Sequence, residues 1–146
     1  MHHIIIKLAE FARRAARKLG KFYDDVVDPS GLKATQQGLL YQIHIGDEPA
    51  MGAIAASLIM DLSALGHTLK PLIRDGYVET FADPDDRRVK RVRLTPQGLA
   101  KLEAAMKLWQ IAQQRFEDVV GRDKAEKLRA ALDDIAALDF DLPPAS

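Results

Sequence analysis

The chain has 146 residues and contains no cysteine, so disulfide bonds, thiolate nucleophiles and cysteine-based zinc sites are excluded. Hydrophobic residues make up 47% of it, charged residues make up 29%, and the formal net charge is zero. These values are typical of one globular domain, and no apolar run approaches the roughly 18 residues of a membrane span, so we expect a single cytoplasmic domain. The distribution of charge, rather than its total, must then decide whether the protein binds nucleic acid.

The first element that the sequence predicts is a long amphipathic helix that ends near residues 28–31. Its apolar positions are spaced by four and three: Ile4, Leu8, Phe11, Ala15, Leu19, Phe22 and Val26.

Three shorter helices follow. We expect one over residues 35–45, with Thr35 as its N-cap, and one over residues 51–58, where Met51 occupies a position usually held by a capping Ser or Thr. The third begins at Asp61, another good N-cap, and ends at Asp75 because Gly76 suits the position after a helix.

A β-hairpin is predicted next, with strands over residues 77–81 and 89–94 and a turn favoured by Asp83-Pro84. Five of the seven residues 87–93 are cationic, which predicts a hairpin that carries positive charge at its tip. Asp86 and Arg88 are two residues apart, so the carboxylate can hold the guanidinium in a fixed pose.

Thr95-Pro96 reads as an N-cap followed by proline at the first helical position, and it opens a second long helix that Gly121 ends. A last helix follows to about Leu138. The apolar face of the long helix consists of Leu99, Leu102, Met106, Trp109, Ala112, Phe116 and Val120.

The hairpin resembles the wing of the MarR family of winged-helix transcription regulators, whose pattern is D-x-R, five residues, then L-T. Here Asp86, Arg88 and Leu94-Thr95 fill it, and Gly98 follows. Residues 69–78 look like the end of that family's recognition helix, so the motifs together cover residues 61–99. The resemblance implies a mostly α (α+β) winged helix-turn-helix with a two-stranded wing. Residues 33–98 would form the DNA-binding core, and residues 1–28 and 99–140 the dimerisation helices.

In such a fold the second helix of the helix-turn-helix lies in the major groove of double-stranded DNA. The spacing of Leu65, Leu69 and Leu72 assigns them to the core. The side chains left for the groove are Ser63, Ala64, His67, Thr68 and Lys70. Leu62 and Gly66 depart from the family's usual polar residues, which leaves two interpretations: an A·T-rich site read by apolar and hydroxyl contacts, or a loss of DNA affinity.

The cations of the wing that we expect to reach DNA are Arg87, Arg88 and Lys90, with Asp86 orienting Arg88. An arginine at a hairpin tip can enter a minor groove, where A-tracts concentrate negative potential. The alternative is that these residues form a solvated strand edge, which is common.

The terminal helices are longer than a winged-helix core needs, so their apolar faces require a partner. We expect a homodimer on a pseudo-palindromic operator, with the two recognition helices about 34 Å apart; the alternative is a monomer whose long helices pack on one another.

The resemblance further implies a repressor released by a small, often aromatic or anionic effector. Candidate pocket residues are Phe11, Tyr41 and His44, each of which can equally be ordinary packing. The alternative function is a winged-helix homodimer that no longer reads DNA and serves as a protein-interaction or ligand-binding module.

No catalytic or phosphate-binding motif occurs, and His44, Asp47 and Glu48 match no metal-ligand spacing, so we expect no enzyme activity, metal or cofactor.

Overall fold

The computed structural model describes residues 2–140, and it describes side chains from Leu8 onward. Across this range the chain forms six α-helices, one short 3-10 helix and one hairpin. In chain order they are α1 (His2–Val27), η1 (Asp28–Ser30), α2 (Ala34–Gly46), α3 (Met51–Leu58), α4 (Leu62–Arg74), β1 (Val78–Ala82), β2 (Lys90–Leu94), α5 (Pro96–Val120) and α6 (Arg122–Ala137). The predicted order of helices and hairpin is confirmed.

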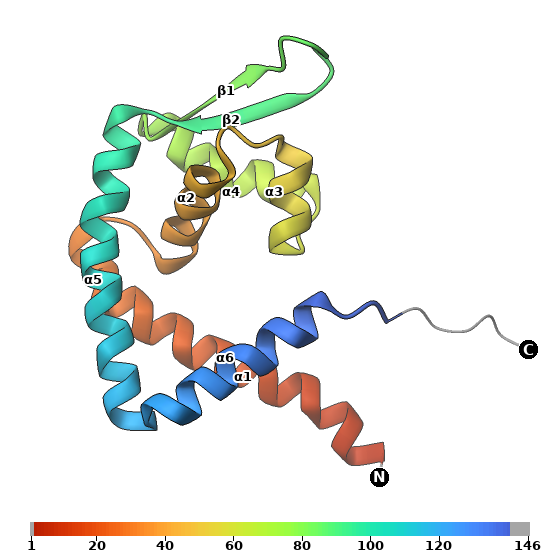
Figure 1. Cartoon of the computed structure of the whole chain (residues 1–146), viewed down its shortest axis with the longest axis vertical. Coiled ribbons are helices and arrows are strands. Elements are labelled where there is room, and N and C mark those ends of the chain that lie inside the picture. The colour runs from red at the N-terminus through yellow and green to blue at the C-terminus, as the bar shows by residue number, and fades with distance from the viewer. Residues whose placement is uncertain (1, 141–146) are drawn as a thin grey trace, which may run out of the picture.

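The elements form two groups joined by α5 (Figure 1). Helices α2, α3 and α4 gather beneath the hairpin, and α5 runs from the end of β2 to the opposite end of the molecule. There it packs against α1 and is followed by α6. The hairpin and the helix-turn-helix therefore form one compact unit, and the long helices extend away from it.

The core of that unit is aliphatic. Helix α4 packs against α3 and β1, and its apolar stripe belongs to one buried cluster with side chains of α2 and the hairpin. The fully buried side chains of this cluster include Leu39, Leu40, Ile43, Leu65, Leu69, Leu72, Val78 and Val92. The predicted inward face of α4 is thus confirmed at all three leucines.

Strands β1 and β2 pair antiparallel, from Val78 opposite Leu94 to Ala82 opposite Lys90. Each strand begins one residue later than the sequence predicts. Residues 83–89 between them form the tip of the hairpin, and we call residues 78–94 the wing.

The N-caps of two helices also differ from the expectation. Thr35 is not an N-cap, because α2 begins at Ala34, whose N–H donates to Asp24 Oδ1 of α1 at 2.6 Å. Helix α3 covers Met51–Leu58 as predicted, but its N-cap is Ala50 rather than Met51, and no side chain caps it. In the first case, a tertiary contact supplies the acceptor that a local side chain would otherwise provide.

The junction between β2 and α5 is rigid. Thr95 Oγ1 accepts a hydrogen bond from the Gly98 N–H at 3.0 Å and donates one to the Gly76 carbonyl at 2.6 Å. A Cβ on Gly98 would overlap the Tyr77 carbonyl oxygen, so only glycine fits where α5 crosses the start of β1. The L-T-x-x-G motif therefore fixes the wing to the long helix.

Within residues 2–140 no single helix is long and apolar enough to cross a membrane. Helices α3 and α4 meet the length and composition criteria only as a pair, and that pair is bent by 106°.

Candidate nucleic-acid interface

Helix α4 presents a polar outer face. Asp61 Oδ1 accepts the Ala64 N–H at 2.6 Å and fixes the first turn. Because the three leucines point inward, Ser63, His67 and Lys70 are exposed on the opposite side. The predicted surface residues Ala64 and Thr68 are half-buried at its edge, and the Thr68 hydroxyl donates to the Ala64 carbonyl at 3.0 Å. Of the five side chains expected at a groove, three are thus fully presented and two lie at the edge.

Leu62, the first residue of α4, is 58% exposed. The sequence marks it as an unusual residue, but its periodicity with Leu65 and Leu69 gives no reason to expect it in solvent. Its place at the first helical position, before the helix packs against the core, explains the exposure.

The turn that precedes α4 contains a second exposed aliphatic residue. Ile59 is 71% exposed and adopts φ 54° and ψ 48°. This left-handed conformation is unfavourable for a β-branched residue, because its Cβ approaches the following carbonyl. The helix-turn-helix therefore holds a strained residue beside its recognition helix.

The tip of the wing is organised around Asp83. Its carboxylate accepts the Asp85 N–H at 2.7 Å and the Asp86 N–H at 3.2 Å, and its other oxygen accepts Arg91 Nε at 2.6 Å. These contacts lower the pKa of Asp83 below its ordinary value, chiefly through the Asp85 N–H and then through Arg91. A buried carboxylate thus holds both the turn and the strand that follows it.

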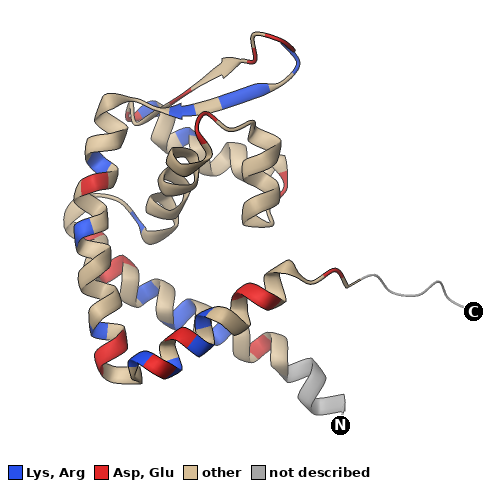
Figure 2. Ribbon diagram, in the orientation of Figure 1, with Lys and Arg blue, Asp and Glu red and all other residues tan. Residues whose placement is uncertain are grey.

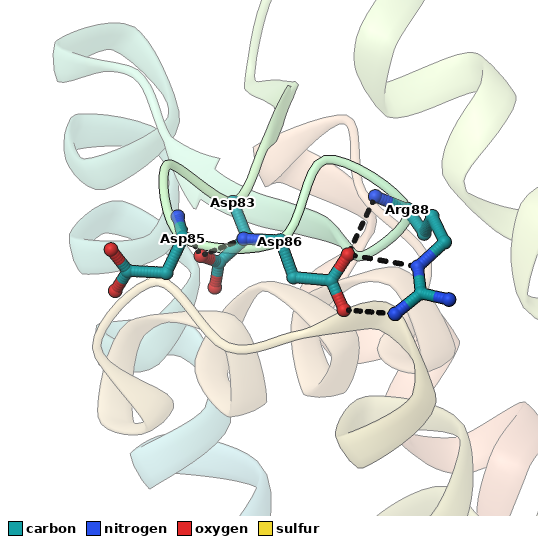
Figure 3. A network of polar contacts seen from close by, with 4 residues as sticks. All are labelled: Asp83, Asp85, Asp86 and Arg88. Carbon is teal, nitrogen blue, oxygen red and sulfur yellow. Dashed lines mark hydrogen bonds and ion pairs between the residues drawn. The ribbon is translucent and has the colours of Figure 1, made fainter.

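Asp86 holds Arg88 in a fixed orientation (Figure 3). Arg88 Nε donates to Asp86 Oδ1 at 3.1 Å and Nη2 donates to Oδ2 at 3.2 Å, while the Arg88 backbone N–H donates to Oδ1 at 3.2 Å. Arg88 lowers the pKa of Asp86 by its side chain first and its backbone second. The Arg88 side chain is nevertheless 90% exposed, so its guanidinium is oriented and still accessible.

The sequence predicts a hairpin that carries positive charge at its tip, but not all five wing cations remain available. Arg93 Nε binds Glu79 Oε1 at 2.6 Å and its guanidinium lies over the Phe81 ring at 4.4 Å. The Glu79 contact raises the Arg93 pKa above its ordinary value. Arg91 binds Asp83, as described. Arg87 and Lys90 are exposed and form no ion pair among the described residues.

Strand β2 of the wing is also fastened to the loop between α2 and α3. Arg91 Nη1 donates to the Glu48 carbonyl at 2.9 Å, and the Val92 N–H donates to the Pro49 carbonyl at 3.0 Å. Figure 2 shows the resulting pattern, with basic residues along β2, both acidic and basic residues at the tip, and acidic residues in that loop. These bonds fix the orientation of the wing relative to the helix-turn-helix, which a two-part DNA contact requires.

The three predicted effector residues line three separate hollows. Phe11 lies beside Arg14 and Arg17 on α1, and His44 lies beside Arg93 near the start of α5. Tyr41 faces a cavity of about 390 Å³ between α1, α2 and α5. The structure therefore does not gather the three residues into one pocket.

The cavity at Tyr41 contains residues that the sequence does not single out as a site. Its walls include Tyr23, Gln37, Met106 and Trp109. The Tyr23 hydroxyl donates to Gln113 Oε1 at 3.1 Å, and burial, with a smaller contribution from Glu117, raises the Tyr23 pKa. Trp109 is the one tryptophan of the chain and falls on the predicted apolar face of α5. That position is the sequence signal that could have pointed to this cavity.

No group of three or more His, Asp or Glu side chains suited to a metal occurs within the described part of the chain. His44, Asp47 and Glu48 line the same hollow without forming such a group.

Comparison with known proteins agrees with this geometry. The family "Winged helix DNA-binding domain" matches residues 32–98, from just before α2 to Gly98. The multiple antibiotic resistance protein MarR of Escherichia coli is 27% identical over 93% of this chain and 88% of its own length. An uncharacterised HTH-type transcriptional regulator of Bacillus subtilis, YdgJ, is 27% identical over 75% of this chain, and the match spans 65% of that relative.

Two solved protein–DNA complexes have the same fold. The transcriptional regulator MosR of M. tuberculosis in complex with DNA is 34% identical, with 88% of this chain and 92% of that chain covered and a TM-score of 0.79. A mutant MarR of E. coli complexed with operator DNA is 26% identical, with coverages of 90% and 94% and a TM-score of 0.81.

Proposed function

We propose that this protein binds a pseudo-palindromic operator as a homodimer and represses the adjacent genes. The proposal starts from the family to which the chain belongs, the MarR family of winged helix-turn-helix transcriptional regulators, which are DNA-binding proteins rather than enzymes. In this proposal α4 enters the major groove, and the wing follows the backbone into the adjacent minor groove. Residues 33–98 form the DNA-binding core.

One observation carries the proposal: Arg88 is held by both oxygens of Asp86 and is 90% exposed. Holding a long side chain in one pose costs conformational entropy, and an exposed ion pair by itself contributes little stability. An oriented cation at the end of a fastened hairpin is suited to binding a polyanion, because the side chain is already ordered and loses little further conformational entropy on binding. Arg87 at the same tip and Lys90 at the start of β2 are two further exposed cations.

The exposed apolar residues of the long helices support a dimer. Leu8 and Phe11 of α1 are 66% and 56% exposed, and α6 presents a matching row. Leu128, Leu132 and Ile135 are 40%, 50% and 54% exposed at helical spacing. Contiguous apolar patches of this kind mark association surfaces. We assign residues 1–28 and 99–140 to dimerisation; of these, residue 1 lies outside the described range.

Release by a small effector forms the third part of the proposal. The cavity at Tyr41 lies between the winged unit and the long helices, and its volume of about 390 Å³ is in the range of small-molecule sites. A ligand that fits this cavity in only one arrangement of the winged unit and the long helices would favour that arrangement, because it binds that state more tightly. The spacing of the two recognition helices in the dimer would then change. Tyr23, Tyr41 and Trp109 favour an aromatic ligand there.

The competing function is a homodimer that has lost specific DNA reading, and exposed Leu62 with Gly66 on α4 is the observation in its favour. Such a protein would use the same cavity or the same helix face to bind a ligand or another protein.

Fluorescence anisotropy separates the two functions. The protein is titrated into a labelled duplex from the intergenic region upstream of its own gene and into a scrambled duplex of equal composition, from 50 to 300 mM salt. Binding of the intergenic duplex at nanomolar protein, at least about 1,000-fold tighter than the scrambled one, supports the regulator. Equal, weak binding to both duplexes supports the competing function. Light scattering tests the dimer through a mass near twice the 16.2 kDa of one chain.

A further inference from the structure

The first two turns of α4 carry an apolar strip on the surface that the proposed function presents to DNA. Leu62 and Gly66 are four residues apart, so they lie one above the other on the same side of the helix. Leu62 is 58% exposed, and its side chain points towards the N-terminal end of the helix, the end that meets base edges.

Nothing in the structure of the free protein requires a glycine at position 66. A Cβ built there meets no atom within 4 Å, and its φ is not positive, so neither crowding nor backbone conformation requires it. Glycine weakens a helix interior relative to alanine. An exposed leucine and an unneeded glycine, each unfavourable for the free protein, therefore occupy one strip.

Both features suit one group in the major groove. The C5-methyl of a pyrimidine is the apolar feature of that groove, and thymine carries it in ordinary DNA. A missing Cβ at Gly66 lets the helix backbone approach a base edge closely, and Leu62 supplies the apolar surface beside it. The polar residues on the outer face of these turns are Ser63 and His67, so the bidentate arginine contact with guanine has no donor there.

We propose that Leu62 and Gly66 form an apolar notch that reads the 5-methyl group of a thymine in each half-site, and that Leu62 is a specificity-determining residue of this regulator. The inference rests on the proposed DNA binding. It gives the exposed leucine a role in recognition, whereas the competing function treats the same residue as evidence that recognition is lost.

The test begins with a duplex selected from a random library by the full-length protein. Each thymine of a half-site is then replaced in turn by deoxyuridine, which removes the methyl group and leaves the base pairing intact. We expect one position at which the loss weakens binding about fourfold, as burial of one methyl group predicts, and about 15-fold when both half-sites are changed. Replacing that T·A pair by 5-methylcytosine·guanine, compared with cytosine·guanine, should show the same preference for the methylated base.

The variant Leu62→Ala should bind thymine and deoxyuridine duplexes equally at that position, while Leu62→Met should keep the preference. Gly66→Ala should unfold at a higher temperature than the original protein and bind the selected duplex more weakly. Ile45→Ala, at an exposed position of α2, is the matched control and should change neither the unfolding temperature nor the binding of the selected duplex.

Two results overturn the inference alone: specific binding in which no thymine methyl matters, or a methyl preference that survives Leu62→Ala. Failure to select any sequence overturns the proposed function and the inference together, so the two failures are distinguishable.

Discussion

Asp83 and Arg91 meet where the tip of the wing joins its second strand, and there Arg91 Nε donates a 2.6 Å hydrogen bond to Asp83 Oδ2. The same carboxylate caps the turn through the Asp85 N–H, and the same guanidinium reaches the Glu48 carbonyl. One ion pair thus connects the tip of the wing, its second strand and the loop between α2 and α3. We therefore expect Arg91 to affect DNA binding by positioning the wing and Arg88 to affect it through its charge.

Arg88→Ala should weaken operator binding about tenfold, because it removes a charge-assisted contact with DNA. The slope of log affinity against log salt should fall in magnitude by about one per subunit. Arg91→Met should also weaken binding, by loosening the wing, but should leave the salt slope unchanged. Anisotropy at four salt concentrations measures both quantities. Arg122→Ala on α6 is the control, and equal slopes for the Arg88 and Arg91 variants would contradict this division of roles.

The Asp83 ion pair should make stability depend on acidity. Its folded pKa is lowered, first by the Asp85 N–H and then by Arg91, so its stabilisation is present above the unfolded pKa near 3.9. The stabilisation is lost as pH falls through the lowered folded value. Urea unfolding at fixed protein concentration should show Asp83→Asn less stable than the original protein at pH 7, with the difference shrinking below about pH 4. A difference that stays constant down to pH 2 would remove the carboxylate from this role.

Gly98→Ala should destabilise the fold by about 3 kcal/mol, because the new methyl group overlaps the Tyr77 carbonyl oxygen and backbone must move to relieve it. Gly52→Ala in α3 is the matched control, since a Cβ there meets no atom within 4 Å. Thermal unfolding compares the two variants. Similar melting temperatures would show that the junction between β1 and α5 is looser than described.

Ile59→Asn should stabilise the protein by about 1 kcal/mol, because asparagine tolerates the left-handed conformation that costs isoleucine about that much. The residue is 71% exposed, so little packing is lost. Ile45→Asn makes the same chemical change at an exposed helical position and should give no gain. Chemical unfolding at matched protein concentrations measures the stability of both variants. A less stable Ile59→Asn protein would indicate that the Ile59 side chain is packed.

Leu132→Glu should shift the protein from dimer to monomer, because it places a charge in the middle of the apolar row on α6. Ala130→Glu adds the same charge on the opposite side of the helix and should leave the mass unchanged. Sedimentation velocity reports the mass, and anisotropy should show weaker operator binding for the monomeric variant. A Leu132→Glu protein that stays dimeric would place the interface elsewhere.

The elements and their order could be predicted from the sequence because the signals are local. Helical spacing identified the inward leucines of α4, and Asp61 and Thr95 act as the expected N-caps. The D-x-R and L-T motifs located the wing and indicated the family. Thr35 failed as a cap because Asp24, ten residues earlier, binds the Ala34 N–H instead.

The site itself depended on contacts that no local pattern contains. Arg91 binds a carbonyl 43 residues away, so its charge is engaged by the fold, while Arg87 and Arg88 remain available. The cavity at Tyr41 forms where α1, α2 and α5 meet, which is why Tyr23 and Trp109 were not recognised, while Phe11 and His44 line other hollows.

For this protein, the sequence by itself determined the secondary structure, the wing and the family, since short-range spacing, capping and turn chemistry act within a few residues. Tertiary structure alone decided which cations are free to meet a partner and where a ligand-sized space opens. Charge neutralisation and cavities arise between segments distant in the chain, and their positions follow from packing rather than from any one segment.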